Sequence, residues 1–294
     1  MRLAAPVSTL LERFHASKPV RAWSLIITLY GDAVVPRGGG LWLGSLTRIM
    51  ALFGIDAGHV RTAMSRLGAD GWLARERIGR NSYYRLSKRG EASFVAATRR
   101  IYLGEERRFD GKLRLALLGP QVDDRSSVRP SLERGGFVAL APTIHVALAD
   151  PPPDTVAFDG VFVITADAGD TGPAIAAAAW KLEPLAAAYR NFVERFTALD
   201  EALVAGQALD PENALVARVL LIHEFRRIVL RDPALPRALL PSPWPGAAAR
   251  ALTARIYRRV AEVAETYLDK HARNERGPLP APDPNFFRRF EAGS

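Results

Sequence analysis

The feature that most constrains this chain is an amphipathic helix pattern that passes directly into a hairpin pattern, between residues 56 and 86. The apolar positions of the helix recur at the spacing of one buried face: Val60, Ala63, Met64 and Leu67. Asp56 is a good N-cap for this helix, and Gly71 is placed to end it. Residues 72–86 have strand character on both sides of Gly79-Arg80-Asn81-Ser82, which has the composition of a tight turn.

A polar helix that carries arginines and is followed at once by a basic hairpin is typical of a winged helix-turn-helix. In that fold the helix enters the major groove of DNA, and the hairpin meets the backbone or the minor groove. The helix residues that we expect to contact bases are His59, Arg61, Thr62, Ser65 and Arg66. At the hairpin tip we expect Arg80 and Asn81 to meet phosphates, and Arg37, beside a glycine-rich turn, to touch the DNA backbone. The alternative is that these residues form only a solvated surface.

The positive charge of the chain lies in the same region. The net charge is +9, and residues 1–110 hold eighteen Lys/Arg against nine Asp/Glu, whereas the remaining residues hold twenty-two of each. The whole excess therefore lies in the segment that contains the helix and the hairpin. This asymmetry favours a polyanionic partner, double-stranded DNA, at that end of the molecule.

Several other classes of protein are disfavoured by composition. The chain has no cysteine, which excludes disulfides and thiolate zinc sites, and its five histidines are scattered without metal-ligand spacing. We find no set of nucleophile and base, so we expect no catalytic residues, no metal and no cofactor. The first twenty residues lack the apolar core of a signal peptide, and no apolar run is long enough to span a membrane, so we expect a cytoplasmic protein.

The pattern along the chain predicts an α+β multidomain protein. After an N-terminal extension (1–20), we expect the winged helix-turn-helix domain at 21–103. Strand, helix, strand, strand then predict a ferredoxin-like α+β domain at 104–172, with Asp123 and Asp124 starting its helix. Long amphipathic segments predict a helical C-terminal domain at 173–273, and the proline- and charge-rich residues 274–294 predict a flexible tail.

Four stretches together resemble the PaaX family, bacterial repressors of phenylacetate-degradation operons. They are residues 24–46, 60–73, 79–86 and 221–246, the last of which includes Leu221-Ile-His-Glu-Phe-Arg-Arg and Pro241-Ser-Pro-Trp-Pro-Gly246. The resemblance implies a winged helix, a central Cas2-like ferredoxin domain, a helical C-terminal domain and a homodimer on a DNA operator. It also implies that phenylacetyl-CoA, or a related acyl-CoA, relieves repression.

The densest polar cluster of the C-terminal half is the candidate site for that effector. It comprises His223, Arg226, Arg227 and Arg231, with Trp244 further on. The arginines could bind the phosphates of a CoA ester while Trp244 lines an apolar acyl pocket. An internal salt-bridge network, for example between Glu224 and Arg227, explains the same residues equally well.

Two enzymatic functions remain as alternatives to a repressor. A Cas2-like domain raises the possibility of a metal-dependent nuclease with the winged helix as a tether. However, Asp123 and Asp124 come too late after the first strand to hold its cation, and we expect them to begin a helix instead. A basic CoA-ester enzyme is disfavoured because the chain lacks a nucleophile–base set.

Overall fold

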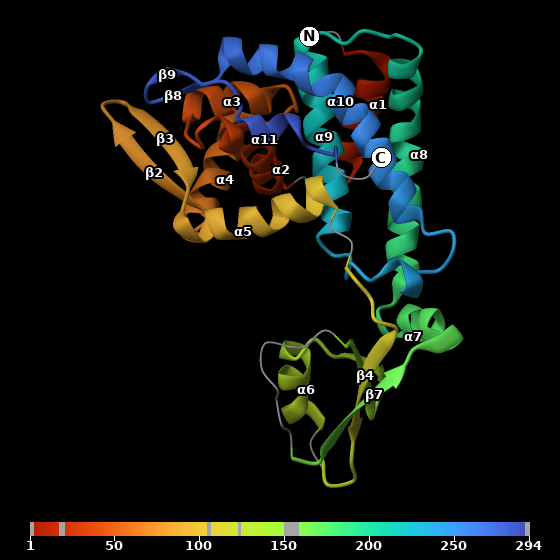
Figure 1. The fold of residues 1–294 in the computed structure, drawn as a ribbon. Helices are drawn as coiled ribbons and strands as arrows, with labels where there is room; N and C mark the ends of the chain where they lie inside the picture. The colour runs from red at the N-terminus through yellow and green to blue at the C-terminus, as the bar shows by residue number, and fades with distance from the viewer. Residues whose placement is uncertain (1–2, 18–20, 105–106, 123–124, 150–158, 292–294) are drawn as a thin grey trace. The chain divides into compact units, whose positions relative to one another are not determined.

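The structure is a computed structural model that describes residues 3–17, 21–104, 107–122, 125–149 and 159–291. Asp123 and Asp124, predicted to start a helix, lie outside the described residues. The chain forms two compact units, one comprising residues 1–105, 189–231 and 246–294, the other residues 106–188 and 232–245. Both units combine helices and strands, so the predicted α+β class is confirmed (Figure 1).

The first unit contains the predicted helix and hairpin. Helices α2 (Ala22–Leu29), α3 (Leu43–Ala51) and α4 (Ala57–Ala69) precede strands β2 (Leu73–Ile78) and β3 (Asn81–Leu86). Strand β1 (Leu41–Trp42) pairs with β3, which gives the antiparallel order β1-β3-β2. Helix α5 (Lys88–Thr98) follows and continues as a π-helical turn, η3 (Arg99–Leu103).

Local signals set the ends of these elements. The side chain of Asp56 accepts hydrogen bonds from the backbone N–H of Gly58 and His59, at 2.7 and 2.9 Å, and so starts α4. The Ser87 hydroxyl caps α5 by accepting from the Gly90 N–H at 3.0 Å. A Cβ at Gly90 would lie 2.5 Å from the Trp72 carbonyl oxygen, so the approach of α5 to the hairpin requires glycine there.

Long helices complete this unit. Helices α8 (Leu182–Val204), α9 (Pro211–Val229) and α10 (Pro245–His271) are long, α8 begins in the second unit, and α9 packs against both α1 (Ala5–Ala16) and α2 (Figure 1). The predicted extension and residues 189–231 and 246–273 of the predicted helical domain therefore share one unit with the DNA-binding candidate. The boundaries of the five predicted segments stay predictions. The two units are defined by packing contacts, and each combines stretches that are far apart in the sequence.

The expectation of a flexible tail is wrong for residues 274–291. Strands β8 (Arg273–Asn274) and β9 (Gly277–Pro278) and helix α11 (Pro284–Phe287) form there. Phe286, Arg289 and Phe290 are all buried. The prediction of disorder was based on the proline and charge content of this segment and did not consider its aromatic side chains. The burial of Phe286 and Phe290 holds the segment in place.

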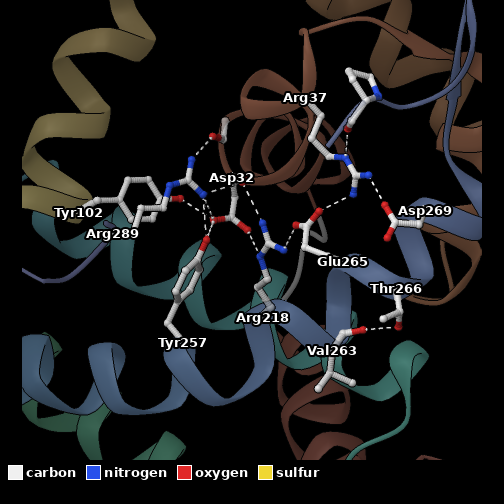
Figure 2. Close-up of polar contacts among 12 residues, drawn as sticks. Asp32, Arg37, Tyr102, Arg218, Tyr257, Val263, Glu265, Thr266, Asp269 and Arg289 are labelled. Carbon is white, nitrogen blue, oxygen red and sulfur yellow. Dashed lines mark hydrogen bonds and ion pairs between the residues drawn. The ribbon is translucent and has the colours of Figure 1, made fainter. Parts of the chain in front are cut away.

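A buried polar network joins distant parts of the first unit (Figure 2). Asp32, which has no exposed side-chain surface, accepts from Arg218 Nε at 2.6 Å and from Arg289 Nη1 at 3.0 Å. The hydroxyls of Tyr102 and Tyr257 also donate to it, at 2.7 and 2.9 Å. Burial alone would raise the pKa of Asp32, but the two guanidinium groups outweigh it, and the pKa lies below its ordinary value.

The second unit is built on a four-stranded antiparallel sheet in the order β5-β6-β4-β7. Its strands are β4 (Lys112–Leu118), β5 (Val138–Ala141), β6 (Ile144–Leu148) and β7 (Val161–Asp167), with helix α6 (Arg125–Arg134) between β4 and β5. Helix α7 (Gly172–Ala179) and the turn η5 (Arg237–Leu239) also belong to this unit. One apolar cluster joins Leu113 and Val146 to Ala176, Leu235 and Leu239.

Candidate nucleic-acid interface

Helix α4 separates its apolar and polar residues as the sequence predicted. Its buried face consists of Val60, Ala63, Met64 and Leu67. Its exposed face carries all five predicted base-contact residues: His59, Arg61, Thr62, Ser65 and Arg66. The helix therefore presents hydrogen-bond donors and two guanidinium groups to solvent on one side, as a helix that enters a DNA groove would.

The exposed residues of α4 differ in how they are held. Arg61 has no hydrogen-bond or ion-pair partner among the described residues. Arg66 lies 3.6 Å from the carboxylate of Asp70, and its guanidinium stacks over the Trp23 ring at 5.5 Å. The Thr62 hydroxyl donates to the Gly58 carbonyl at 3.1 Å, which leaves its oxygen free to accept. Arg61 is thus the less constrained of the two predicted base-contacting arginines, whereas Arg66 is partly oriented by its neighbours.

The hairpin carries more cations than the sequence analysis assigned to it. Arg80 and Asn81 are exposed at its tip, as predicted. The register places Arg75 opposite Tyr84 and Arg77 opposite Ser82, so both arginines share the strand face that begins with the buried Leu73. Arg75 also donates to the Ser82 hydroxyl, which orients it. The period of two in residues 73–78 could have revealed this basic strand face.

The expectation that Arg37 touches the DNA backbone is wrong. Its side chain is 1 % exposed and pairs with the carboxylates of Glu265 and Asp269, while its Nε donates to the Pro280 carbonyl at 2.7 Å (Figure 2). The predicted turn itself is present, with φ of +88° at Gly38 and +76° at Gly39. The turn directs Arg37 inward, where two acidic residues of α10, far away in the sequence, neutralise it.

The five residues predicted to bind an effector are divided between the two units, so their assembly into one site stays a prediction. Arg231 belongs to the first unit and Trp244 to the second, where Trp244 packs against the Leu113 cluster. His223 is buried beside the Thr28 hydroxyl, 3.1 Å from its Nδ1, and Arg227 is half-exposed and 3.5 Å from Glu224. The alternative of an internal ion pair therefore holds for Arg227, because the helix brings it next to Glu224.

Arg226 of that set lines a cavity. The cavity has a volume of ≈ 280 Å³, lies within the first unit between α2, α5 and α9, and contains Trp72 rather than Trp244. Trp72 and Phe94 were not predicted from the sequence as cavity residues. No local signal marks them, because they meet Arg226 only through tertiary packing.

Two other properties concern the part of the chain that the structure describes. Within it, no cluster of three or more His, Asp or Glu side chains could hold a metal ion. None of its helices combines the length and apolar character that crossing a bilayer requires.

Comparison with known proteins decides the family. A model of PaaX-like proteins matches residues 21–90, and a model of the PaaX-like C-terminal domain matches residues 180–270. The chain is 36 % identical over 299 residues to the Transcriptional repressor PaaX of Escherichia coli (strain K12), with 97 % of this chain and 94 % of that protein covered. The chain belongs to the PaaX family.

A solved structure supports the fold of this PaaX-family chain. The uncharacterized protein Rv0674 from Mycobacterium tuberculosis matches with a TM-score of 0.50 and 23 % identity, over 76 % of this chain and 89 % of that one. At this identity the match concerns the fold alone. The first family match, residues 21–90, contains α4 and the β2–β3 hairpin, and thus every predicted DNA contact on those two elements.

Proposed function

We propose that this PaaX-family chain is a transcriptional repressor that binds operator DNA through α4 and the β2–β3 hairpin. The observation that carries the proposal is the exposed row of Arg61, Thr62, Ser65 and Arg66 on a helix that leads directly into a basic hairpin. Arginine can pair bidentately with guanine, and hairpin cations can neutralise phosphates. The similarity to a protein named as a transcriptional repressor favours regulation over catalysis.

We further infer that the two predicted folds are present. Helices α2, α3 and α4, followed by a two-stranded hairpin whose second strand pairs with β1, have the arrangement of a winged helix-turn-helix. The antiparallel order β5-β6-β4-β7, with α6 crossing from β4 to β5, matches a ferredoxin-like sheet. Superposition of each unit on independently solved members of these folds would test both assignments.

The repressor proposal has a direct test. Full-length protein would be used to select binding sites from a random DNA duplex pool, and affinity for the selected site would be compared with a scrambled duplex. We expect specific affinity that exceeds non-specific affinity by roughly 10³-fold or more and falls steeply with added salt. Equal affinity for both duplexes at every salt concentration would contradict the proposal.

We also propose that the repressor binds DNA as a homodimer. Strand β7 lies at an edge of its sheet and exposes Phe162, Val163 and Ile164, at 57 %, 40 % and 47 %. Three consecutive large apolar residues on an edge strand favour pairing with a second copy of the same strand. A two-fold dimer would present two copies of α4 to the two halves of a palindromic operator.

Finally, we propose that phenylacetyl-CoA, or a related acyl-CoA, weakens operator binding. Such an effector must bind the DNA-free form more tightly, and DNA must then weaken effector binding by the same factor. Titration calorimetry of the protein with acyl-CoA, with and without operator, would measure both factors. Equal effector affinity in the two titrations would rule out this form of regulation.

A further inference from the structure

The cavity bounded by α2, α5 and α9 has the lining of a binding site for a small apolar group. Its wall is mainly apolar and includes six large apolar side chains: Ile27, Trp72, Phe94, Ile101, Ile222 and Leu230. Ser93 and Ala96, which are exposed on α5, also line it, so the cavity reaches the surface of the protein. A ligand can therefore enter without unfolding the unit.

The aromatic wall of the cavity depends on one glycine. The Trp72 and Phe94 rings meet edge to face, with centroids 6.4 Å apart and planes at 81°. Phe94 lies over Gly31, where a Cβ would be 2.3 Å from a ring carbon of Phe94. The absence of a side chain at residue 31 therefore lets Phe94 occupy the cavity wall opposite α9.

Besides Asp32 and Arg100, the cavity is lined by the charged side chain of Arg226. Its Nε donates to the Thr28 hydroxyl at 2.7 Å, and its Nη2 donates to the Ser24 carbonyl at 2.9 Å and hydroxyl at 2.8 Å. Its Nη1 has no hydrogen-bond partner among the described residues, and none of their carboxylates pairs with this guanidinium. Burial, and then the neighbouring Arg227, lower the pKa of Arg226 to about 10, so it is still cationic at neutral pH.

Size limits what the cavity can hold. Ligand pockets of proteins usually measure roughly 300–1,000 Å³, and this cavity of ≈ 280 Å³ is at the small end. It can hold one ring with a short acyl chain, whereas a complete CoA ester is much larger. The nucleotide part of such an ester would have to lie outside, beyond the exposed Ser93 and Ala96.

We propose that this cavity binds the aryl-acyl end of a thioester effector, with the ring against Trp72 and Phe94 and an acyl oxygen accepting from Arg226. This site assignment rests on the proposed function, which supplies the thioester. The apolar walls fit a ring, and a partly buried cation without a carboxylate partner fits a polarised carbonyl oxygen.

The position of Trp72 connects this site to the DNA-contacting elements. Trp72 lies between α4 and β2 in the sequence. Its backbone N–H donates to the Leu67 carbonyl at 2.9 Å, and its carbonyl oxygen accepts from the backbone N–H of Ser87 at 3.0 Å. An effector ring that displaces the side chain of Trp72 or Phe94 would therefore move the segment that connects α4 to the β2–β3 hairpin. This gives the effector a direct route to operator affinity.

The test fills the cavity and leaves the rest of the chain unchanged. Ala97 lines the cavity from α5, and Ala97→Leu adds apolar volume while preserving helix propensity. Ala92→Leu, on the same helix but exposed and outside the cavity, is the matched control. Calorimetry would measure the affinity of each protein for phenylacetyl-CoA, CoA alone and phenylacetate. Circular dichroism would verify folding, and Ala96→Leu would replace Ala97→Leu if the latter does not fold.

We expect Ala97→Leu to bind phenylacetyl-CoA about 10-fold or more weakly than the unaltered protein, and Ala92→Leu to bind it equally well. CoA alone should not distinguish the three proteins. Unchanged thioester affinity in folded Ala97→Leu and Ala96→Leu would overturn the site assignment but not the effector. Absence of thioester binding by the unaltered protein, despite operator binding, would overturn the effector proposal and this site with it.

Discussion

Arg218 Nε donates to a carboxylate oxygen of Asp32 over 2.6 Å, and neither side chain is exposed to solvent. The two residues are 186 positions apart in the sequence. Arg218 belongs to α9, whereas Asp32 lies three residues after the end of α2, in the segment that leads to the candidate DNA-contacting elements. Arg218 Nη1 also donates to Glu265 of α10 at 2.5 Å (Figure 2). The N-terminal and C-terminal segments of the first unit are thus joined by buried charges that compensate one another.

This network predicts a large effect of one neutral substitution. Asp32→Asn keeps the side-chain shape but leaves two buried guanidinium groups without their shared carboxylate. We expect the free energy of unfolding to fall by about 3–5 kcal/mol. Urea denaturation would measure the loss. Asp70→Asn, which removes an exposed partner of Arg66, is the control and should lower stability by at most about 1 kcal/mol. Equal denaturation midpoints for the two variants would contradict this role of Asp32.

Because His223 is buried, we expect the free energy of unfolding to depend on pH. Burial, followed by Arg226 and Arg227, lowers its pKa to about 3, below the ordinary 6.5. The folded state therefore keeps the imidazole neutral, and the unfolded state binds a proton first as the pH falls. The stabilisation is complete above pH 6.5 and declines as the pH falls toward 3, by at most about 1.4 kcal/mol per pH unit.

His223→Gln removes this titration. We expect urea denaturation at several pH values to give a shallower decline between pH 6.5 and 3 for His223→Gln than for the unaltered protein. Parallel curves for the unaltered protein and His223→Gln would show that the buried histidine does not set this dependence.

Arg61 predicts an effect on DNA sequence preference. Arg61→Ala removes an exposed cation that has no partner among the described residues, so its loss should leave stability almost unchanged. We expect operator affinity to fall by about 1–3 kcal/mol, with relaxed preference at one base position, in fluorescence anisotropy against single-base operator variants. Arg259→Ala, exposed on α10, is the control and should bind like the unaltered protein. A uniform loss of affinity across all sequences would instead assign Arg61 to the phosphates.

The hairpin cations predict a different signature. Arg77→Ala and Arg80→Ala should each weaken binding to every duplex alike, because phosphates do not differ between sequences. Each should also reduce the slope of log K against log salt concentration by about 0.9. Anisotropy titrations at four salt concentrations would measure both effects, with Arg61→Ala as the comparison. An unaltered slope for both variants would place the hairpin away from the DNA backbone.

Strand β7 predicts the effect of a charge on assembly. Phe162→Asp replaces the most exposed residue of the apolar row by a carboxylate, so we expect the dimer to dissociate at least about 10-fold more readily. Analytical ultracentrifugation over a range of concentrations would measure this change. Val204→Asp, at a position 61 % exposed on α8, is the matched control. A monomeric unaltered protein, or an equally stable Phe162→Asp dimer, would exclude β7 as the dimer surface.

Local pattern was sufficient for the helix and hairpin that bear the candidate DNA contacts. The N-cap at Asp56, the buried period from Val60 to Leu67 and the Gly79-Arg80 turn depend on neighbours within a few residues. The exposed positions of Arg61 and Arg80 follow from the same short-range geometry. The family resemblance also rested on contiguous residues, which is why comparison with known proteins bore it out.

The surroundings of Arg37 and Arg226 could not be predicted from local sequence and are known only from the folded chain. Arg37 and Arg80 both stand beside turn glycines, yet Arg37 is buried against Glu265, 228 positions away, while Arg80 remains exposed. Arg226 shares a cavity with Trp72 and Phe94, whereas Trp244, nearer in sequence, lies in the other unit. Helix periodicity indicates which face of a segment is buried, but it does not indicate which element covers that face. Packing between elements that are distant in the sequence determines the covering element.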